Sequence, residues 1–186
     1  MAVQTFTAVL DHVESITPRI RHLAFKRVDG DHFQYIPGQF ISIHFEADGK
    51  PIRRSYSVAS IPGKSEFIEF AISYVKGGPA SELLFNIQPH TKLEFSGPYG
   101  RLILREEAIK RCFLIATGTG VTPYRAMLPQ IMQKLAADPQ LEVWVLLGVQ
   151  HRIDQLYPTD FLSYVAQNPR LHFRVYHSRD ELQDAK

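Results

Sequence analysis

The sequence has little cysteine, little net charge and no long hydrophobic run. Cys112 is the single cysteine, which excludes a disulfide framework and a metal cluster held by cysteines. The formal net charge is only +2, which argues against a nucleic-acid binder that relies on bulk charge. No stretch approaches the roughly 18 apolar residues of a membrane helix, and the N-terminus lacks the signal-peptide pattern. These absences predict a soluble, cytoplasmic protein without a membrane or nucleic-acid partner. We also expect a monomer.

Two kinds of catalytic site are also missing. The eight histidines are scattered along the chain and do not fall at metal-ligand spacing, so we predict no metal site. No G-x-S-x-G elbow is present, which excludes the usual serine hydrolase arrangement. What the chain does have is 186 residues with 45% hydrophobic content, enough for a real core.

The first half of the chain alternates in short apolar and polar steps. Glycine and proline turns such as YIPGQ, ADGKP, IPGK and KGGP separate these stretches, which is the strand signal. We therefore expect residues 1–105 to form a six-stranded antiparallel Greek-key barrel. The predicted strands are QTFTAVL, RHLAFKR, QFISIHF, RSYSVA, EFIEFAISYV and KLEFSG.

The second half, residues 106–186, has the pattern strand, helix, strand, helix, strand. CFLIA and LEVWVLLGV are nearly continuous apolar runs, typical of parallel strands covered on both faces. Apolar residues at helical spacing follow the first run, and a second helix is predicted over TDFLSYVAQN, with Thr159 as its N-cap. LHFRVYHS is the third strand. We expect a partial doubly wound parallel α/β nucleotide-binding domain that is incomplete at its C-terminus.

GTGVTP, residues 118–123, joins the first of these strands to its helix. Glycines free the backbone for close approach, and Thr122 and Pro123 suit the N-cap and first position of a helix. A helix N-terminus there would face an anion. An ordinary glycine turn between strand and helix explains the same residues equally well.

Two further motifs lie in the first half. RRSYSVAS places Arg54 and Tyr56 on one strand face and Ser57 on the other, a set that could clamp a phosphate and stack on a planar ring. KGGPAS places Ser81 after a glycine turn, where it could cap a short helix that faces a phosphate. A solvent-facing strand and a hairpin connection are the corresponding structural interpretations.

The order of these motifs, R-S-Y-S, G-G-P-A-S, G-P-Y-G and G-T-G-V-T-P, resembles the ferredoxin–NADP reductase superfamily along the whole chain. The resemblance implies an FAD- and NAD(P)H-dependent oxidoreductase. It places Tyr56, Ser57 and Thr122 at the catalytic centre, with the flavin ring on Tyr56. It also implies a set of residues that bind the two cofactors: Arg54, Tyr56, Ser57, Val58, Ser73, Gly77, Gly78, Ala80 and Ser81 for FAD, and Gly118, Thr119, Gly120, Thr122 and Pro123 for the nicotinamide dinucleotide.

The choice between NADPH and NADH depends on YHSRD. Ser178 and Arg179 resemble the pair that binds the 2′-phosphate in NADPH-using members, although a solvated loop explains them too. The electron acceptor would be a ferredoxin, a flavodoxin or an oxygenase component. The family's Cys-Gly-x-Pro turn and aromatic C-terminus are not found before Lys186, which predicts a shortened chain. Two alternatives stay open: a flavin-binding electron-transfer module without NAD(P)H turnover, and a docking domain without flavin.

Overall fold

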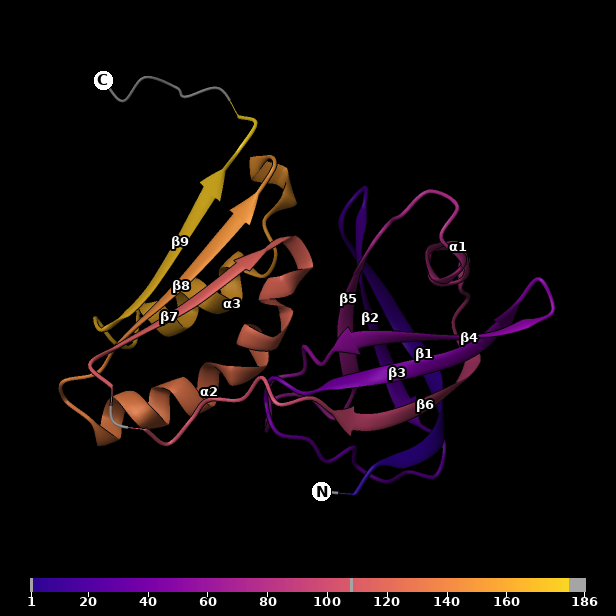
Figure 1. Cartoon of the computed structure of the whole chain (residues 1–186), viewed down its shortest axis with the longest axis horizontal. Coiled ribbons are helices and arrows are strands. Elements are labelled where there is room, and N and C mark those ends of the chain that lie inside the picture. The colour runs from indigo at the N-terminus through magenta and orange to yellow at the C-terminus, as the bar shows by residue number, and fades with distance from the viewer. Residues whose placement is uncertain (1, 108, 181–186) are drawn as a thin grey trace.

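The computed structural model describes residues 2–107 and 109–180 and contains two sheets. Figure 1 shows the two sheets side by side, each with its own helices. The antiparallel sheet has the strand order β4-β3-β6-β1-β2-β5, and the parallel sheet has the order β7-β8-β9. The antiparallel strands are β1 (Gln4–Thr17), β2 (Ile20–Arg27), β3 (Phe40–Ala47), β4 (Lys50–Ser57), β5 (Ile68–Ser73) and β6 (Lys92–Tyr99). The remaining elements are α1 (Pro79–Asn86), β7 (Arg111–Thr117), η1 (Gly118–Val121), α2 (Thr122–Ala137), β8 (Glu142–Val149), η2 (Arg152–Asp154), α3 (Pro158–Val165) and β9 (Leu171–His177).

The antiparallel sheet curls into a half-barrel. Its two outermost strands are β4 and β5, and the segment after β4 returns to β5, where the Ala59 N–H donates to the Glu69 carbonyl at 2.7 Å. The inner face is filled by aromatic rings that are fully buried, with Phe25 and Phe70 stacked at a centroid distance of 5.7 Å. Because alternate residues of a strand face opposite sides, this core confirms the strand pattern predicted for the first half.

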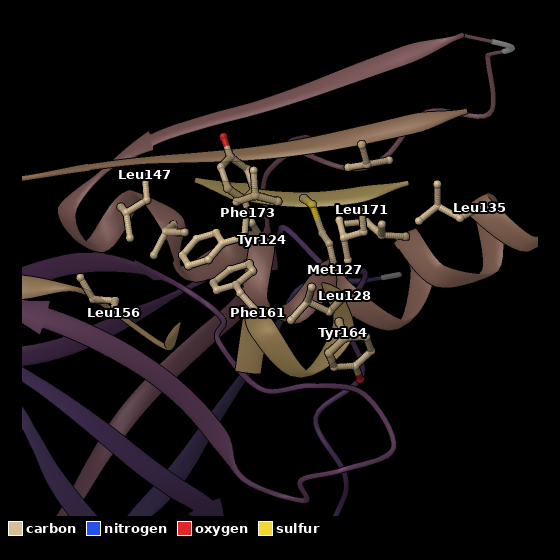
Figure 2. Packing of buried hydrophobic residues seen from close by; sticks show 14 of the residues in the cluster. Tyr124, Met127, Leu128, Leu135, Leu147, Leu156, Phe161, Tyr164, Leu171 and Phe173 are labelled. Carbon is tan, nitrogen blue, oxygen red and sulfur yellow. The ribbon is translucent and has the colours of Figure 1, made fainter. Parts of the chain in front are cut away.

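In the parallel domain, α2 and α3 pack on the same face of the sheet. Both connections cross between neighbouring parallel strands, and right-handed crossovers in one direction place their helices on one side. Figure 2 shows the resulting core, in which the rings of Phe161 and Phe173 stack at 4.6 Å beside Met127 and Leu128. The helical spacing predicted for α2 is confirmed, because its apolar positions are all buried: Tyr124, Met127, Leu128, Ile131 and Leu135.

The opposite face of the parallel sheet differs from the prediction. The apolar run CFLIA was expected to be covered on both sides, yet Phe113 is 54% exposed and Ile115 is 67% exposed. Within the described residues nothing packs over these two side chains to bury them. The partly buried Cys112 points to the covered face and packs as a small hydrophobe, with its thiol pKa raised by burial.

Several predicted ends of elements are wrong by up to one turn. Thr122 is not the N-cap of α2, because the 3-10 turn η1 already begins the helical path at Gly118. The N-cap of α3 is Tyr157 in a left-handed conformation rather than Thr159, and the helix ends at Val165. The predicted turn GPYG is instead largely the last part of β6. Local sequence suggests good capping residues, but the chain path that packing imposes selects which of them is used.

The two sheets share a packed boundary. Ile20 of β2 and Ala71 of β5 belong to the same buried cluster as Val121, Leu156 and the rest of the parallel domain's core. Among the described residues, no helix is long and apolar enough to cross a membrane. In residues 2–107 and 109–180, no group of three or more histidine, cysteine or acidic side chains is placed to hold a metal ion.

Candidate functional site

A cavity lies where the parallel strands end against the half-barrel. It has a volume of about 640 Å³ and combines the carboxyl ends of β7, β8 and β9 with the β1–β2 turn and the end of β5. Ligands of open parallel sheets bind at the carboxyl ends of the strands, so this is the expected side. The lining residues are Arg19, Ile20, Ser73, Tyr74, Thr117, Gly118, Thr119, Gly148, Val149, Gln150, Asp154, Tyr176, His177 and Ser178.

The turn after β7 presents backbone to this cavity. Gly118 has a φ of +51°, a conformation that costs glycine little, and a Cβ built on it would meet no atom within 4 Å. Thr117, the N-cap of η1, makes no side-chain capping hydrogen bond. The first N–H groups of a helical turn have no partner within the helix, so this turn has the donors that an anion requires. A Cβ on Gly120 would lie 3.6 Å from the Ala116 Cβ, an ordinary contact, so only the first glycine is demanded by geometry.

Thr122 and Pro123 lie behind the turn rather than in the cavity. Both are buried, and Thr122 is 2% exposed. The Thr122 hydroxyl oxygen has no hydrogen-bond partner among the described residues. Its predicted place at a catalytic centre stays a prediction.

The strand β4 carries the predicted flavin residues. The Tyr56 ring is half-buried and stacks against Phe70 of β5 at a centroid distance of 5.0 Å and an interplanar angle of 23°. Burial raises the pKa of the Tyr56 phenol, against the opposing effect of the Arg54 charge. Arg54 is exposed and donates from Nη1 to the carbonyl of its neighbour Arg53. Ser57, the last residue of β4, is half-buried. The tyrosine and the arginine therefore lie close together, as alternation along the strand predicted.

Val58 follows β4 and is fully buried. Its N–H donates to the Gln39 carbonyl at 3.1 Å, so its backbone donor is already used inside the protein. The described contacts of Val58 are structural, and its cofactor role stays a prediction.

The glycine turn after β5 begins at the wall of the cavity. Ser73, the last residue of β5, lines the cavity, and Gly77 has a φ of +72° with no atom within 4 Å of a built Cβ. The helix α1 begins at Pro79 with Gly78 as N-cap, which corrects the prediction that Ser81 caps this helix. Ser81 is buried, and its hydroxyl accepts the Val75 N–H at 2.9 Å, so it fixes the turn from inside. Ala80, in the first turn of α1, is also buried.

The loop after β9 is tied to the loop after β8. The Ser178 N–H donates to the Val149 carbonyl at 3.0 Å, and the Arg179 N–H donates to the Gln150 carbonyl at 2.9 Å. The next residue, Asp180, accepts the Arg152 N–H at 2.8 Å, and its hydrogen bond with His151 lowers the pKa of its carboxyl. Two exposed arginines, Arg152 and Arg179, therefore sit on neighbouring loops at the edge of the cavity.

The structure brings only part of the predicted set into one cavity. The cavity is lined by Ser73, Gly118, Thr119 and Ser178. No residue of β4 lines it, and β4 is connected to it through β5, where Phe70 stacks on Tyr56 and Ser73 lines the cavity. Sequence reasoning missed Arg19, Tyr74, Asp154, Tyr176 and His177, which also line the cavity. Tyr176 and His177 directly precede the predicted Ser178 and could have been found as the end of β9. No sequence pattern around Arg19 indicates that it lines the cavity, because only the tertiary structure brings the β1–β2 turn to the parallel sheet.

This arrangement defines a two-domain oxidoreductase class, with a half-barrel for a flavin and a parallel α/β domain for a nicotinamide dinucleotide. Comparison with known proteins agrees: residues 7–103 match the family described as oxidoreductase FAD-binding domain, and residues 114–186 match the oxidoreductase NAD-binding domain. The chain belongs to the ferredoxin–NADP reductase superfamily. The predictions of the family, the fold class and the two cofactors are confirmed.

Individual relatives are similar along most of this chain. A protein of Sorangium cellulosum named ferredoxin–NADP reductase B is 31% identical, over 95% of this chain and 71% of its own length. Methane monooxygenase component C of Methylosinus trichosporium is 32% identical, over 76% of this chain and 40% of its own. A crystal structure of a ferredoxin–NADP reductase from Neisseria gonorrhoeae with bound FAD and NADP has a TM-score of 0.79 at 21% identity, covering 95% of this chain and 69% of that one.

The chain is shorter than several of these relatives. It spans 52% of the length of two Yersinia reductases named for CDP-6-deoxy-L-threo-D-glycero-4-hexulose-3-dehydrase, to which it is 27–28% identical over 96% of its own length.

Proposed function

We propose that this chain binds FAD on the half-barrel and NADPH in the cavity, and passes electrons from the nicotinamide through the flavin to a protein acceptor. When bound, the two cofactors supply the hydride transfer and the one-electron chemistry. The acceptor would be a ferredoxin, a flavodoxin or an oxygenase component. The Sorangium and Methylosinus relatives are named for such systems, which supports this choice. A monomer in the cytoplasm is part of the same proposal.

One observation carries the proposal. The uncapped turn Gly118–Val121 opens into the same cavity as Ser73, and Ser73 ends the strand on which Phe70 supports Tyr56. A dinucleotide phosphate at the turn and a planar ring near Tyr56 would therefore be neighbours. Binding and orientation of two planar cofactors is the main task of a protein in this chemistry.

The residues present fit both groups. For a dinucleotide, the open space in front of Gly118 and the first N–H groups of η1, which have no partner within that turn, provide an anion site. For a flavin, Tyr56 offers an aromatic ring fixed from behind by Phe70, and Arg54 offers a nearby guanidinium for a phosphate. Gly77, at positive φ with open space around it, begins the turn that would lie along the same pyrophosphate.

The preference for NADPH depends on the two loop arginines. A 2′-phosphate is a dianion, and the forked guanidinium of Arg179 or Arg152 binds such a group well. Asp180 is occupied by His151 and by the Arg152 backbone, so this acidic side chain is tied into the loop. We therefore propose that Arg179, next to Ser178 on the cavity wall, discriminates NADPH from NADH.

The visible spectrum of the purified chain tests the function. FAD is added to the protein without oxygen, unbound FAD is removed, and NADPH or NADH is mixed in while the flavin absorbance in the visible range is followed. Rapid bleaching, faster with NADPH, is expected. A bound flavin that neither nucleotide bleaches would instead indicate a flavin module without nicotinamide turnover, and no flavin binding would refute the proposal.

A further inference from the structure

Arg125 connects the two domains through a single, partly buried guanidinium. It lies on α2 in the turn that follows Thr122, and its side chain is 16% exposed. Nη1 donates to the Glu69 carboxylate at 2.6 Å and to the Ala59 carbonyl at 2.9 Å, both in the half-barrel domain. Nε donates to the Asp160 carboxylate on α3 at 2.6 Å. The side chain therefore ties α2, α3, the segment after β4 and the strand β5 to one another.

Glu69 is the half-barrel's part of this contact. It is 8% exposed, accepts the Ser65 hydroxyl at 2.5 Å and lies 3.4 Å from Nε2 of His22 on β2. Burial alone would raise the pKa of this carboxyl, but hydrogen bonds from His22, Ser65 and Arg125 outweigh it and lower the pKa to about 2. The carboxylate is therefore ionised at neutral pH and ready to hold a guanidinium.

Tyr157 of the parallel domain closes the contact from the other side. The Cζ of Arg125 lies 4.7 Å from the centre of the Tyr157 ring, which favours the cation over the ring face. The Tyr157 hydroxyl lies 2.9 Å from Nδ1 of His22 and makes a further hydrogen bond between the domains. The contact is thus a network rather than one ion pair.

Stability alone is a weak reason for such a network. Well-packed apolar residues often stabilise as much as a buried ion pair, because desolvation offsets the attraction between the charges. Apolar contact is available here, since Ile20 and Ala71 already pack into the core of the other domain. Apolar contacts are non-directional, so they do not fix the angle between the two domains. The planar fork of arginine fixes its partners in distance and in angle.

The partners of Arg125 are the neighbours of the candidate site. Ala59 is two residues beyond Ser57, and Glu69 precedes Phe70, the ring that supports Tyr56. Arg125 itself lies on the helix that continues directly from the turn Gly118–Val121. We propose that Arg125 is a positioning residue. It sets the distance and angle between the turn Gly118–Val121, here called the dinucleotide turn, and β4, here called the flavin strand. This inference rests on the proposed function.

Three variants and a control test it in the full chain. Arg125→Met removes the guanidinium but keeps most of the volume, Glu69→Gln removes the partner's charge, and the double variant completes a cycle. Arg170→Met is the matched control. Like Arg125, Arg170 makes three hydrogen bonds, but its acceptors are the carbonyls of Leu135, Asp138 and Leu141, all in its own domain. It therefore reports the cost of losing a buried arginine without losing the link.

The first measurement follows flavin reduction in a single turnover at several NADPH concentrations. We expect Arg125→Met to bind FAD and NADPH within about threefold of wild type but to bleach the flavin about 10- to 100-fold more slowly, because small misplacements of reacting groups have effects of this size. Glu69→Gln should slow bleaching less, and the double variant should be no slower than Arg125→Met. Arg170→Met should bleach at the wild-type rate once it is saturated.

The second measurement needs no cofactor. Amide hydrogen exchange of the apoprotein should become about tenfold faster in Arg125→Met at residues 58–70 and at residues 118–126 together, since local opening is reported by exchange. Arg170→Met should change exchange only inside the parallel domain. If wild type binds no FAD, the proposed function fails, and this coupled change still decides whether Arg125 links the domains.

Either of two results would overturn the inference: wild-type bleaching in Arg125→Met, or equal slowing in Arg170→Met. Should Arg125→Met fail to fold, Arg125→Lys decides in its place, because lysine keeps the charge but not the fork. The slow bleaching should persist in the lysine variant, and a wild-type rate there contradicts the role given to the fork.

Discussion

Gly38 is the position where the structure leaves least room for a side chain. It is the third residue of a turn over Ile36–Gln39, in which the Gln39 N–H donates to the Ile36 carbonyl at 3.0 Å, and its φ is +101°. A Cβ built there would lie 1.8 Å from the Leu102 carbonyl oxygen and 2.4 Å from the Met127 Cε. The half-barrel turn is therefore covered directly by the linker between β6 and β7, to which Leu102 belongs, and by α2.

The cost of Gly38→Ala has two parts. A left-handed conformation costs a non-glycine residue about 1–2 kcal/mol. The overlap adds about 1–3 kcal/mol, because the methionine methyl can move away but the linker carbonyl must shift with its backbone. We expect a loss of about 2–5 kcal/mol in the free energy of unfolding, a large part of the roughly 5–15 kcal/mol typical of a folded protein.

Urea unfolding of Gly38→Ala, with Gly30→Ala as control, measures these parts separately. Gly30 has a φ of +81° and no atom within 4 Å of a built Cβ, so its variant carries the conformational cost alone. The single tryptophan, Trp144 on β8, reports unfolding of the parallel domain, and far-ultraviolet circular dichroism reports both domains. Gly38→Ala should be the less stable variant by both probes. Equal losses in the two variants would refute the close contact with Leu102 and Met127.

Three further predictions concern the site. Arg54→Ala should weaken FAD binding by about 1.5–3 kcal/mol, the value of a hydrogen bond to a charged group, and unchanged affinity in a flavin fluorescence titration would contradict its role. Arg179→Ala should weaken NADPH at least tenfold more than NADH, as measured by titration, and equal losses would remove the 2′-phosphate contact. The pKa of Glu69 is lowered from 4.5 to about 2 in the folded protein. The ionised carboxylate therefore stabilises the fold above pH 4.5, and this stabilisation is lost as the pH falls towards 2. The stabilisation amounts to about 3 kcal/mol at most. Glu69→Gln should therefore approach wild type in urea midpoint at low pH, and a difference that stays constant from neutral pH down to the folded-state pKa would contradict this.

The fold was predictable because its signals are local. The apolar alternation at the start of β1, the helical spacing of α2 and the glycine turns at Gly77 and Gly118 each lie within a short run of consecutive residues. Sequence patterns of this length report directly which face of an element is buried. The ends of elements were less predictable. Helix α2 shows why, since a positive φ at Gly118 lets the helical path begin one turn before Thr122.

The candidate site was predictable only where its residues are consecutive. R-S-Y-S, G-G-P-A-S and G-T-G-V-T-P are short segments, and their order along the chain is what predicts a cofactor role from the amino-acid sequence. Arg19 and Tyr74, which also line the cavity, are ordinary residues of a turn and a strand end in the sequence. Nothing in their neighbourhood indicates that they meet the carboxyl ends of β7 and β8.

The contact that Arg125 makes between the domains is the clearest example of a feature that sequence patterns do not predict. Arg125 lies 56 residues from Glu69 and 35 residues from Asp160 along the chain, and each is a common charged residue in an amphipathic element. His22, which metal-ligand spacing leaves as one of several scattered histidines, is 6% exposed and faces Glu69.

Yet this unpredicted network determines how the predicted motifs face one another. A flavin strand and a dinucleotide turn can each be intact in its own domain and still be unproductive if the domains meet at another angle. The reactive geometry therefore depends on the interface, where sequence patterns are least informative. Substitutions at Arg125 or Glu69 should then impair the reaction while every recognisable motif remains unchanged.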